Sequence, residues 1–199
     1  MNDQAALAPF TTLLDMDLGT LDPQREVVER RLDDLRELFL EAPSAGDAVV
    51  YRVYGIPVPP TGANLLCSTT VLEPGTAGRE YYMTKGHFHQ ARDRAEVYLG
   101  LAGEGRLVMA TEDGRHAVEP IRRGTVSYVP GGWAHRSVNV GDRPLVFFAI
   151  YVGDAGHDYR TVERTGFPVL VVAGADGPEI VANPRYREVG RCRYSSAAT

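Results

Sequence analysis

Cysteine is scarce in this sequence, and its scarcity limits how the chain can be stabilised. The two cysteines, Cys67 and Cys192, lie far apart and outside any Cys-x-x-Cys pattern. Two thiols cannot form a disulfide framework, and a closed structural zinc site usually draws on several cysteines. A hydrophobic core must therefore hold the chain together, and 199 residues, 44% of them hydrophobic, suffice for one domain.

Basic charge and long hydrophobic runs are also in short supply. The net charge is −5, whereas sequence-independent binding to nucleic acid or to anionic lipid needs a basic surface. No apolar run approaches the ~20 residues of a membrane-spanning helix. The start of the chain lacks the basic and apolar regions of a secretory signal. We therefore expect no nucleic-acid partner, no membrane span and a cytoplasmic location.

One long helix is predicted before the strand-rich part of the chain, over residues 23–41. Asp22 can cap its start, Pro23 suits its first turn, and Pro43 ends it. This helix would pack on the chain's own sheet or on a partner subunit, and the sequence leaves both open. The apolar residues that recur at helical spacing on one face are Val28, Leu32, Leu35 and Phe39.

From residue 48 onward, short apolar or alternating runs recur and end at Gly, Pro or Asp. This pattern predicts an all-β antiparallel sandwich or barrel, with a hairpin at Asp113-Gly114 and a short helical turn at 159–165. We divide the chain into an N-terminal extension (1–47), a barrel domain (48–186) and a C-terminal tail (187–199). Strands are predicted over 48–57, 63–73, 79–84, 95–101, 105–111, 116–121, 125–129, 134–140, 144–152, 168–173 and 178–182.

Three histidines and one glutamate carry the strongest chemical signal. His87 and His89 are two residues apart, so on a strand both imidazoles point to one face. Glu96 begins the next strand-like run with Tyr98 on the same face, and His135 follows a Pro-Gly-Gly turn. Three imidazoles and one carboxylate are typical of a catalytic transition-metal site with open positions. His116, by contrast, stands alone after a turn and is assigned to solvent.

The two stretches that hold these residues resemble the paired motifs of cupins. The second fits the superfamily pattern, Gly, five residues, Pro-x-Gly-x-x-His-x-x-x-Asn, at every position from Gly124 to Asn139. The first departs from the commonest form. Six residues separate His89 from Glu96, where three or four are usual, and Tyr81 stands at the expected early glycine.

Four blocks together resemble the cupin-type glucose-6-phosphate isomerases best known from archaea. They are Thr84-Lys-Gly-His-Phe-His89, Asp93-Arg-Ala-Glu-Val-Tyr98, Trp133-Ala-His135-Arg and Tyr151 with Asp154-Ala-Gly-His-Asp-Tyr159. The resemblance covers roughly residues 48–186. It implies a cupin double-stranded β-helix, or jelly-roll barrel, here with an N-terminal helix. It also implies a homodimer that holds one divalent metal ion per subunit, Fe2+ first, with Mn2+, Ni2+ or Zn2+ as alternatives.

The same resemblance assigns roles to individual residues. His87, His89, Glu96 and His135 would bind the metal, and Tyr98 and His157 would contact the sugar chain. Lys85, the only lysine of the chain, is the obvious cation beside the phosphate, although on a strand its side chain would alternate away from Thr84. The groups implied to receive the substrate phosphate are Thr70, Thr84, the backbone at Gly86, and Tyr151.

The implied reaction interconverts glucose 6-phosphate and fructose 6-phosphate through a metal-bound cis-enediolate. A nearby group would move the proton between C1 and C2. Glu96 is the first candidate for that role, with Tyr98 and His157 as alternatives, and a direct hydride shift stays open. Two rival functions remain: another cupin enzyme, either an isomerase of a different sugar phosphate or an iron oxygenase, and a noncatalytic sugar-binding cupin.

Overall fold

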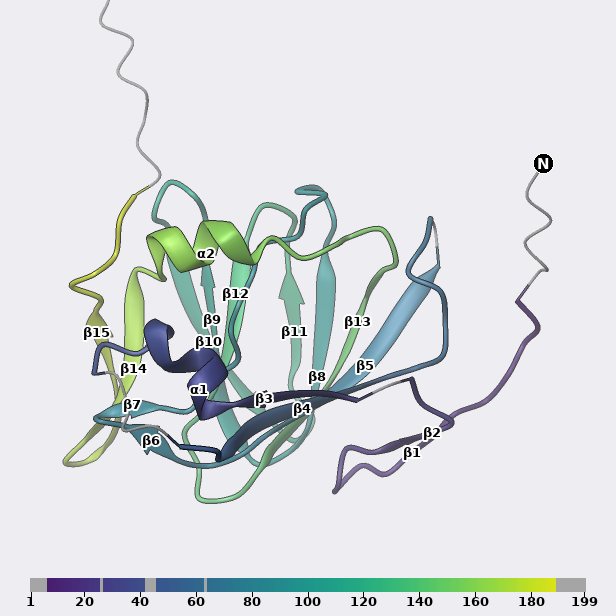
Figure 1. Cartoon of the computed structure of the whole chain (residues 1–199), viewed down its shortest axis with the longest axis horizontal. Coiled ribbons are helices and arrows are strands. Elements are labelled where there is room, and N and C mark those ends of the chain that lie inside the picture. The colour runs from purple at the N-terminus through teal and green to yellow at the C-terminus, as the bar shows by residue number, and fades with distance from the viewer. Residues whose placement is uncertain (1–6, 26, 42–45, 63, 189–199) are drawn as a thin grey trace, which may run out of the picture.

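The computed structural model describes residues 7–25, 27–41, 46–62 and 64–188, and it is dominated by β-strands (Figure 1). The predicted all-β antiparallel barrel is confirmed. The observed strands are β1 (Leu13–Leu14), β2 (Leu21–Asp22), β3 (Val28–Arg31), β4 (Val49–Gly55), β5 (Leu65–Leu72), β6 (Thr76–Ala77), β7 (Glu80–Tyr81), β8 (Glu96–Ala102), β9 (Glu104–Ala110), β10 (His116–Arg122), β11 (Val126–Val129), β12 (Ala134–Asn139), β13 (Leu145–Val152), β14 (Val169–Gly174) and β15 (Gly177–Ala182).

Two sheets form the barrel wall. The larger has the strand order β11-β8-β13-β5-β4-β3 and the smaller has β10-β9-β12, with antiparallel pairing throughout. Side chains that alternate inward from both sheets fill the space between them. A third sheet, β15-β14-β7-β6, lies at the side of the barrel (Figure 1). The predicted hairpin is confirmed, because Asp113-Gly114 joins β9 to β10 and Gly114 has a φ of 85°.

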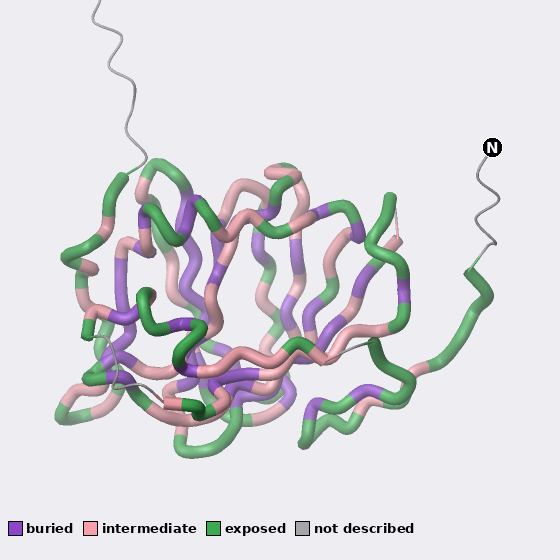
Figure 2. Tube along the Cα trace, viewed as in Figure 1, coloured by how far each residue is buried: buried purple, intermediate pink, exposed green. Residues whose placement is uncertain are grey.

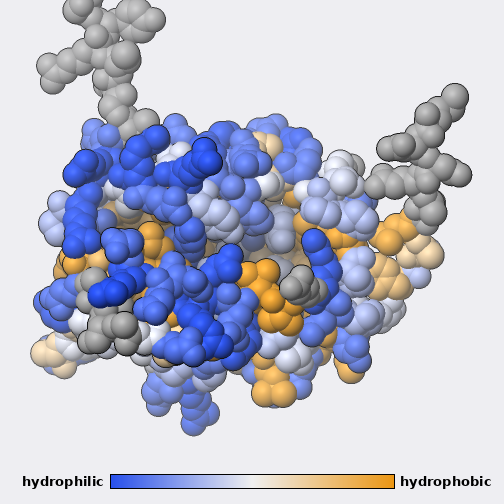
Figure 3. All heavy atoms as spheres, in the orientation of Figure 1, coloured by the Kyte–Doolittle hydropathy of each residue, from blue (hydrophilic) through white to orange (hydrophobic). Residues whose placement is uncertain are grey.

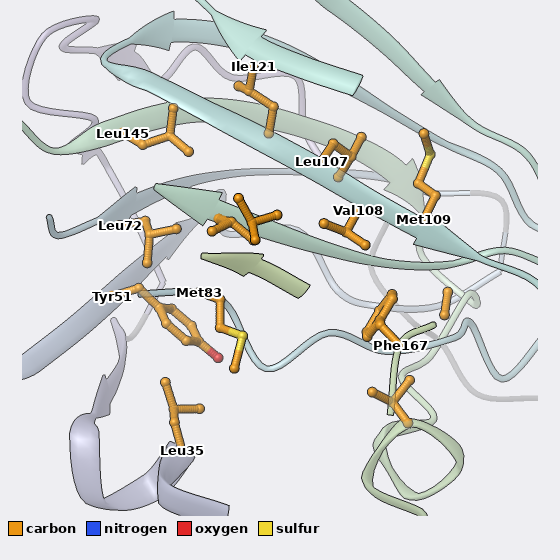
Figure 4. Close-up of a cluster of buried hydrophobic side chains, with 14 of the residues drawn as sticks. Leu35, Tyr51, Leu72, Met83, Leu107, Val108, Met109, Ile121, Leu145 and Phe167 are labelled. Carbon is orange, nitrogen blue, oxygen red and sulfur yellow. The ribbon is translucent and has the colours of Figure 1, made fainter. Parts of the chain in front are cut away.

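The core is continuous from the barrel interior to the layer under the third sheet. Figure 2 shows the buried segments running along the central strands, and Figure 4 shows Leu107, Val108 and Phe167 among the packed side chains. Every residue of β12 is buried, so both faces of this strand are covered. Side chains on one face of β12 therefore point into the barrel interior, and those on the other face pack against the outer layer.

The helix predicted over 23–41 is wrong in extent. Among the described residues of this stretch, only Leu32–Leu35 (α1) is α-helical, followed by a 3-10 turn at Arg36–Leu38 (η1), whereas β3 pairs with β4. The edge of β4 offers backbone hydrogen bonds to an incoming strand, and these outweigh the local helical preference of residues 28–31. The segment before residue 48 thus adds a strand to the larger sheet. Leu32, Leu35 and Phe39 are buried as predicted, but Val28 is exposed.

The second predicted helix is confirmed as α2 (Tyr159–Thr165), which lies across the upper end of the barrel (Figure 1). The side chain of Asp158 caps it by accepting a hydrogen bond from the Thr161 N–H. Among the described residues, no helix is long and apolar enough to cross a membrane. Residues 189–199, most of the predicted tail, lie outside the described part of the chain.

Candidate active site

His87, His89, Glu96 and His135 meet inside the barrel, as the sequence predicts. Glu96 is the first residue of β8 in the larger sheet, and His135 lies on β12 in the smaller one. The segment that carries His87 and His89 is not a regular strand. It runs along the edge of β12 through two backbone hydrogen bonds between His87 and His135, with N···O distances of 3.2 and 3.0 Å. The site therefore joins the two walls of the barrel.

The four side chains offer one potential ligand atom each, and these atoms lie within 4.8 Å of one another. One oxygen of Glu96 lies 3.1 Å from Nε2 of His89 and 3.0 Å from Nε2 of His135. The ring centroids of His87 and His135 are 4.5 Å apart. His89, Glu96 and His135 are almost fully buried, so solvent cannot satisfy their polar atoms.

Two observations fit this cluster to a divalent metal ion. Nε2 of His87 is buried without a hydrogen-bond partner among the described residues, and such an orphaned atom needs a ligand. Nδ1 of His89 lies 2.9 Å from the carbonyl oxygen of Arg94. Because a carbonyl only accepts, Nδ1 carries the proton and Nε2 keeps its lone pair for a metal.

The charges inside the cluster are arranged for cation binding. Burial alone would raise the pKa of Glu96, but the imidazoles of His135 and His89 outweigh it and lower this pKa to about 2. Glu96 is thus ionised at neutral pH. Burial and the neighbouring imidazoles hold the pKa of His87 well below its usual range, so this ring is neutral and able to donate a lone pair.

Tyr98 lies on the same face of β8 as Glu96, as predicted. Its ring stacks on Phe147 at 4.8 Å between centroids and meets the His135 ring edge-on at 5.8 Å. Burial, followed by the charge of Glu96, raises the pKa of Tyr98 well above its usual range. The hydroxyl therefore stays protonated and can act as a hydrogen-bond donor.

His157 lies at the mouth of the site, on the loop between β13 and α2. Its ring centroid is 4.4 Å from that of His87 and 6.2 Å from that of Tyr151. Loss of hydration on the packed side lowers the pKa of His157, although Glu96 opposes this effect. The ring is exposed on its other side, and a neutral imidazole in this position can accept a proton from a bound molecule.

The Thr84-Lys85-Gly86 segment borders the cluster. Oγ1 of Thr84 accepts a hydrogen bond from the Ser137 N–H at 3.0 Å, which leaves the hydroxyl proton of Thr84 available to a ligand. The Lys85 ammonium pairs with Glu163 of α2 at 2.7 Å. Gly86 is buried and has a φ of 75°, which a residue with a Cβ rarely adopts.

Thr70 and Tyr151 lie on the inner face of the larger sheet. Tyr151 is opposite Glu96 in the pairing of β13 with β8, and it is opposite Leu66 in the pairing with β5. Thr70 is four residues beyond Leu66, or about 13 Å along the strand. The two side chains therefore lie at different depths along one wall of the barrel.

Two further tyrosines belong to the site, and the sequence reading assigned neither of them a role. The Tyr159 ring lies parallel to that of His157 at 5.6 Å, and the Lys85 ammonium is 4.9 Å from its centre. Tyr51 of β4 is buried with its hydroxyl beside the Lys85 backbone, and burial raises its pKa to about 12. Tyr159 ends the Gly-His-Asp-Tyr block, so its position next to His157 was a usable signal, whereas Tyr51 had none.

Comparisons with known proteins show what this chain is similar to. The model of the family described as glucose-6-phosphate isomerase (GPI) matches residues 32–183. Glucose-6-phosphate isomerase of Pyrococcus horikoshii is 42% identical over 185 residues, 90% of this chain and 97% of that protein. The enzyme of that name from Thermococcus kodakarensis is 43% identical with the same coverage. A deletion mutant of Bacillus subtilis oxalate decarboxylase aligns with a TM-score of 0.43 and 26% identity, over 54% of this chain and 27% of that one.

Proposed function

This chain belongs to the glucose-6-phosphate isomerase family, and we propose that it interconverts glucose 6-phosphate and fructose 6-phosphate at the His87, His89, Glu96 and His135 cluster. The observation that carries the proposal is the convergence of these four buried side chains, whose ligand atoms lie within 4.8 Å of one another. An aldose–ketose isomerase must act on two adjacent oxygens of the sugar. A single cluster of converging ligands suits that task.

The cluster is a divalent metal site, and iron is the metal that we propose for it. A divalent ion bound there supplies Lewis-acid help and orientation for the C1 and C2 oxygens of the sugar. Three imidazoles and one carboxylate suit Fe2+, and Mn2+, Ni2+ and Zn2+ are the alternatives. Metal analysis of protein purified from its native host, without added metal, tests this assignment. If most of the bound metal were another ion, that ion would replace iron in this assignment.

The chain offers three groups for proton movement, and each has a different character. Glu96 is ionised and belongs to the cluster itself, so we propose that it takes the proton from one carbon and returns it to the other. Its low pKa makes it a weak base, so this role requires the neighbouring carbonyl to acidify the carbon-bound proton. Tyr98 keeps its proton and would hold a sugar oxygen. His157, neutral and at the mouth, would move a hydroxyl proton during ring opening.

We propose that the substrate phosphate binds away from the cluster. The Thr84 hydroxyl, which bonds to Ser137 two residues beyond His135, and the Gly86 N–H lie on one wall, and Thr70 and Tyr151 line the opposing wall. Thr70 is about 13 Å along the strand axis from the level of Glu96, which separates the phosphate end of a sugar phosphate from its reacting carbons. Lys85 is included as a phosphate ligand, although it would have to exchange Glu163 for the phosphate.

The deciding experiment is conversion of fructose 6-phosphate to glucose 6-phosphate before and after chelation. We expect metal-dependent turnover that returns when Fe2+ is added back. The same preparation, tested with other sugar phosphates and for oxygen consumption, separates this activity from a different isomerase or an oxygenase. Binding of the sugar phosphate without turnover would instead support a noncatalytic sugar-binding protein.

A homodimer is the second part of the proposal. The outer face of the larger sheet is apolar where β11, β8 and β13 lie side by side. The N-terminal segment, at the right of Figure 3, adds exposed Leu13 and Leu18. A second copy of the chain supplies the same charge-free surface and so matches it. The residues in two adjacent rows of this outer face are Tyr128, Val97 and Ile150, then Val126, Leu99 and Phe148.

The dimer is tested by mass in solution. We expect the wild-type chain to have twice the subunit mass by light scattering, and Tyr128→Glu combined with Ile150→Glu to be monomeric. Arg79→Glu, on the third sheet and 64% exposed at its side chain, is the matched control and should remain a dimer. A monomeric wild-type protein would contradict the proposed homodimer.

The substrate also motivates the proposed cytoplasmic location. Phosphorylated sugars are charged, so they do not cross membranes unaided, and an enzyme that uses them must share their compartment. Fractionation of the native host tests this location: the activity should follow the cytoplasmic fraction.

A further inference from the structure

Arg136 is a buried cation beside the site, and none of the roles above uses it. It follows His135 directly on β12 and is only 5% exposed. Successive side chains of a strand point to opposite faces. The His135 imidazole therefore enters the barrel, while the Arg136 guanidinium lies behind the strand, in the layer under Phe167. Burial lowers the pKa of Arg136 to about 10, so the group is still charged at neutral pH.

The contacts of Arg136 are unusual for a buried arginine. Nη2 donates a hydrogen bond to the Lys85 carbonyl oxygen at 2.8 Å, and the guanidinium lies 4.7 Å from the centre of the Phe167 ring. Nε has no hydrogen-bond partner among the described residues. Glu80 attracts the guanidinium only at longer range. A charge buried with so little compensation destabilises the fold, which points to a role outside stability.

The Lys85 carbonyl belongs to the same peptide unit as the Gly86 N–H. This unit is trans, so its C=O and N–H bonds point in opposite directions. Arg136 holds the oxygen from behind, and the N–H therefore points toward the site. Within the described ranges, the Gly86 N–H donates to no backbone or side-chain acceptor. A buried donor in this state is available to a ligand.

Packing fixes the same peptide unit. A Cβ added to Gly86 would lie 2.8 Å from Cε2 of Phe167 and 3.1 Å from Cβ of Arg136. The glycine thus sits against a wall made by these two side chains, and they stack on each other. Rotation of the Lys85–Gly86 peptide would break the hydrogen bond to Arg136 and drive the chain into that wall.

We propose that Arg136 is a positioning residue that aims the Gly86 N–H at the substrate phosphate and polarises it, by holding the carbonyl of the same peptide unit from the opposite side. The inference rests on the proposed function, because it takes the phosphate to bind at Gly86. Hydrogen bonding to the carbonyl increases the positive charge on the N–H, and the fixed orientation removes reorganisation on binding. Arg136 itself need not touch the substrate.

The test compares Arg136→Met with Arg136→Lys, and Arg106→Met on neighbouring β9 is the control for loss of an arginine. Inorganic phosphate is the probe. The rise in melting temperature on adding phosphate is measured twice, with metal bound and after chelation. The chelated sample excludes phosphate that binds to the metal itself. For Arg136→Met we expect the phosphate dissociation constant and the KM for fructose 6-phosphate to rise together, by about tenfold, with kcat and metal content within twofold of wild type.

Arg136→Lys keeps the charge but loses the reach and fork geometry of the guanidinium, so a rise of about threefold is expected. If Arg136→Met fails to fold, Arg136→Lys alone tests the inference. An unchanged phosphate constant in the folded variants would overturn the inference, as would a fall in kcat that follows lost metal. An inactive wild-type protein would reject the isomerase proposal, but the phosphate measurement needs no turnover and would still test Arg136.

Discussion

Arg94 donates two hydrogen bonds to the carboxylate of Asp154, from Nε at 2.8 Å and from Nη2 at 2.9 Å. This bidentate pair ties the loop before β8 to the loop that carries His157. The carbonyl of Arg94 also accepts from Nδ1 of His89. One arginine therefore connects the imidazole of His89, a proposed metal ligand, to His157 at the mouth of the site.

Loosening this connection should reduce activity without unfolding the protein. For Arg94→Met we expect kcat/KM for fructose 6-phosphate to fall by at least about tenfold, because small misplacements of a catalytic group are costly to the rate. Thermal stability should change little, since exposed ion pairs contribute little to stability. Arg79→Met breaks a comparable pair with Glu179, far from the site, and should leave kcat/KM unchanged. Equal kinetics for the two variants would contradict the link.

The ligand assignment predicts a contrast between two histidines. His135→Ala should lose bound metal and activity together, because it removes one of the four converging ligands. Loss of one ligand or of its supporting contacts commonly costs a site much of its metal affinity. His116→Ala should change neither quantity, since His116 is exposed at the start of β10. Metal content by mass spectrometry and steady-state rates check both; similar behaviour of the two variants would refute the assignment.

Asp158 should make a pH-dependent contribution to stability. Burial tends to raise its pKa, but hydrogen bonds from Arg92 and Thr161 outweigh this and lower the pKa to about 2. A lowered pKa means that the stabilisation is complete above the unfolded value of about 3.9 and is lost as the pH falls toward 2. For Asp158→Ala we expect a loss of about 1 kcal/mol at pH 7, typical of an N-cap.

Denaturant unfolding of both proteins at pH 7, 5 and 3 measures this contribution. The difference between wild type and Asp158→Ala should be equal at pH 7 and 5 and should shrink at pH 3. A difference that stayed constant down to pH 3 would show that ionisation of Asp158 is irrelevant to it.

Gly86 and Gly124 form a matched pair for backbone strain. Both have positive φ, 75° and 85°. A Cβ at Gly124 meets nothing within 4 Å, whereas a Cβ at Gly86 would clash with Phe167. Gly124→Ala should cost about 1–2 kcal/mol from conformation alone. Gly86→Ala should lower the melting temperature further and raise the KM for fructose 6-phosphate; equal melting temperatures would contradict the crowding at Gly86.

Local sequence patterns predicted much of the barrel because several of its strands carry inward-facing apolar or small residues at every second position. Leu66, Ser68 and Thr70 face inward on β5 while Leu65 stays exposed, and this period of two is readable from one segment at a time. The helix over 23–41 shows where such reading fails. Val28, Leu32, Leu35 and Phe39 have helical spacing, but the free edge of β4 recruits residues 28–31 into a sheet. No local sequence pattern indicates that the edge of β4 is free to pair with these residues.

The sequence by itself determined the chemistry of this protein. The His-x-His pair, Glu96 and His135 carry their ligand character and their inward direction in residue type and strand period. Only the tertiary structure decided which groups would support them. Tyr51 and Arg136 come from strands of different sheets, and both meet the Lys85-Gly86 backbone. Contacts between segments distant in sequence depend on how the sheets close around the core, and residue spacing does not encode that closure.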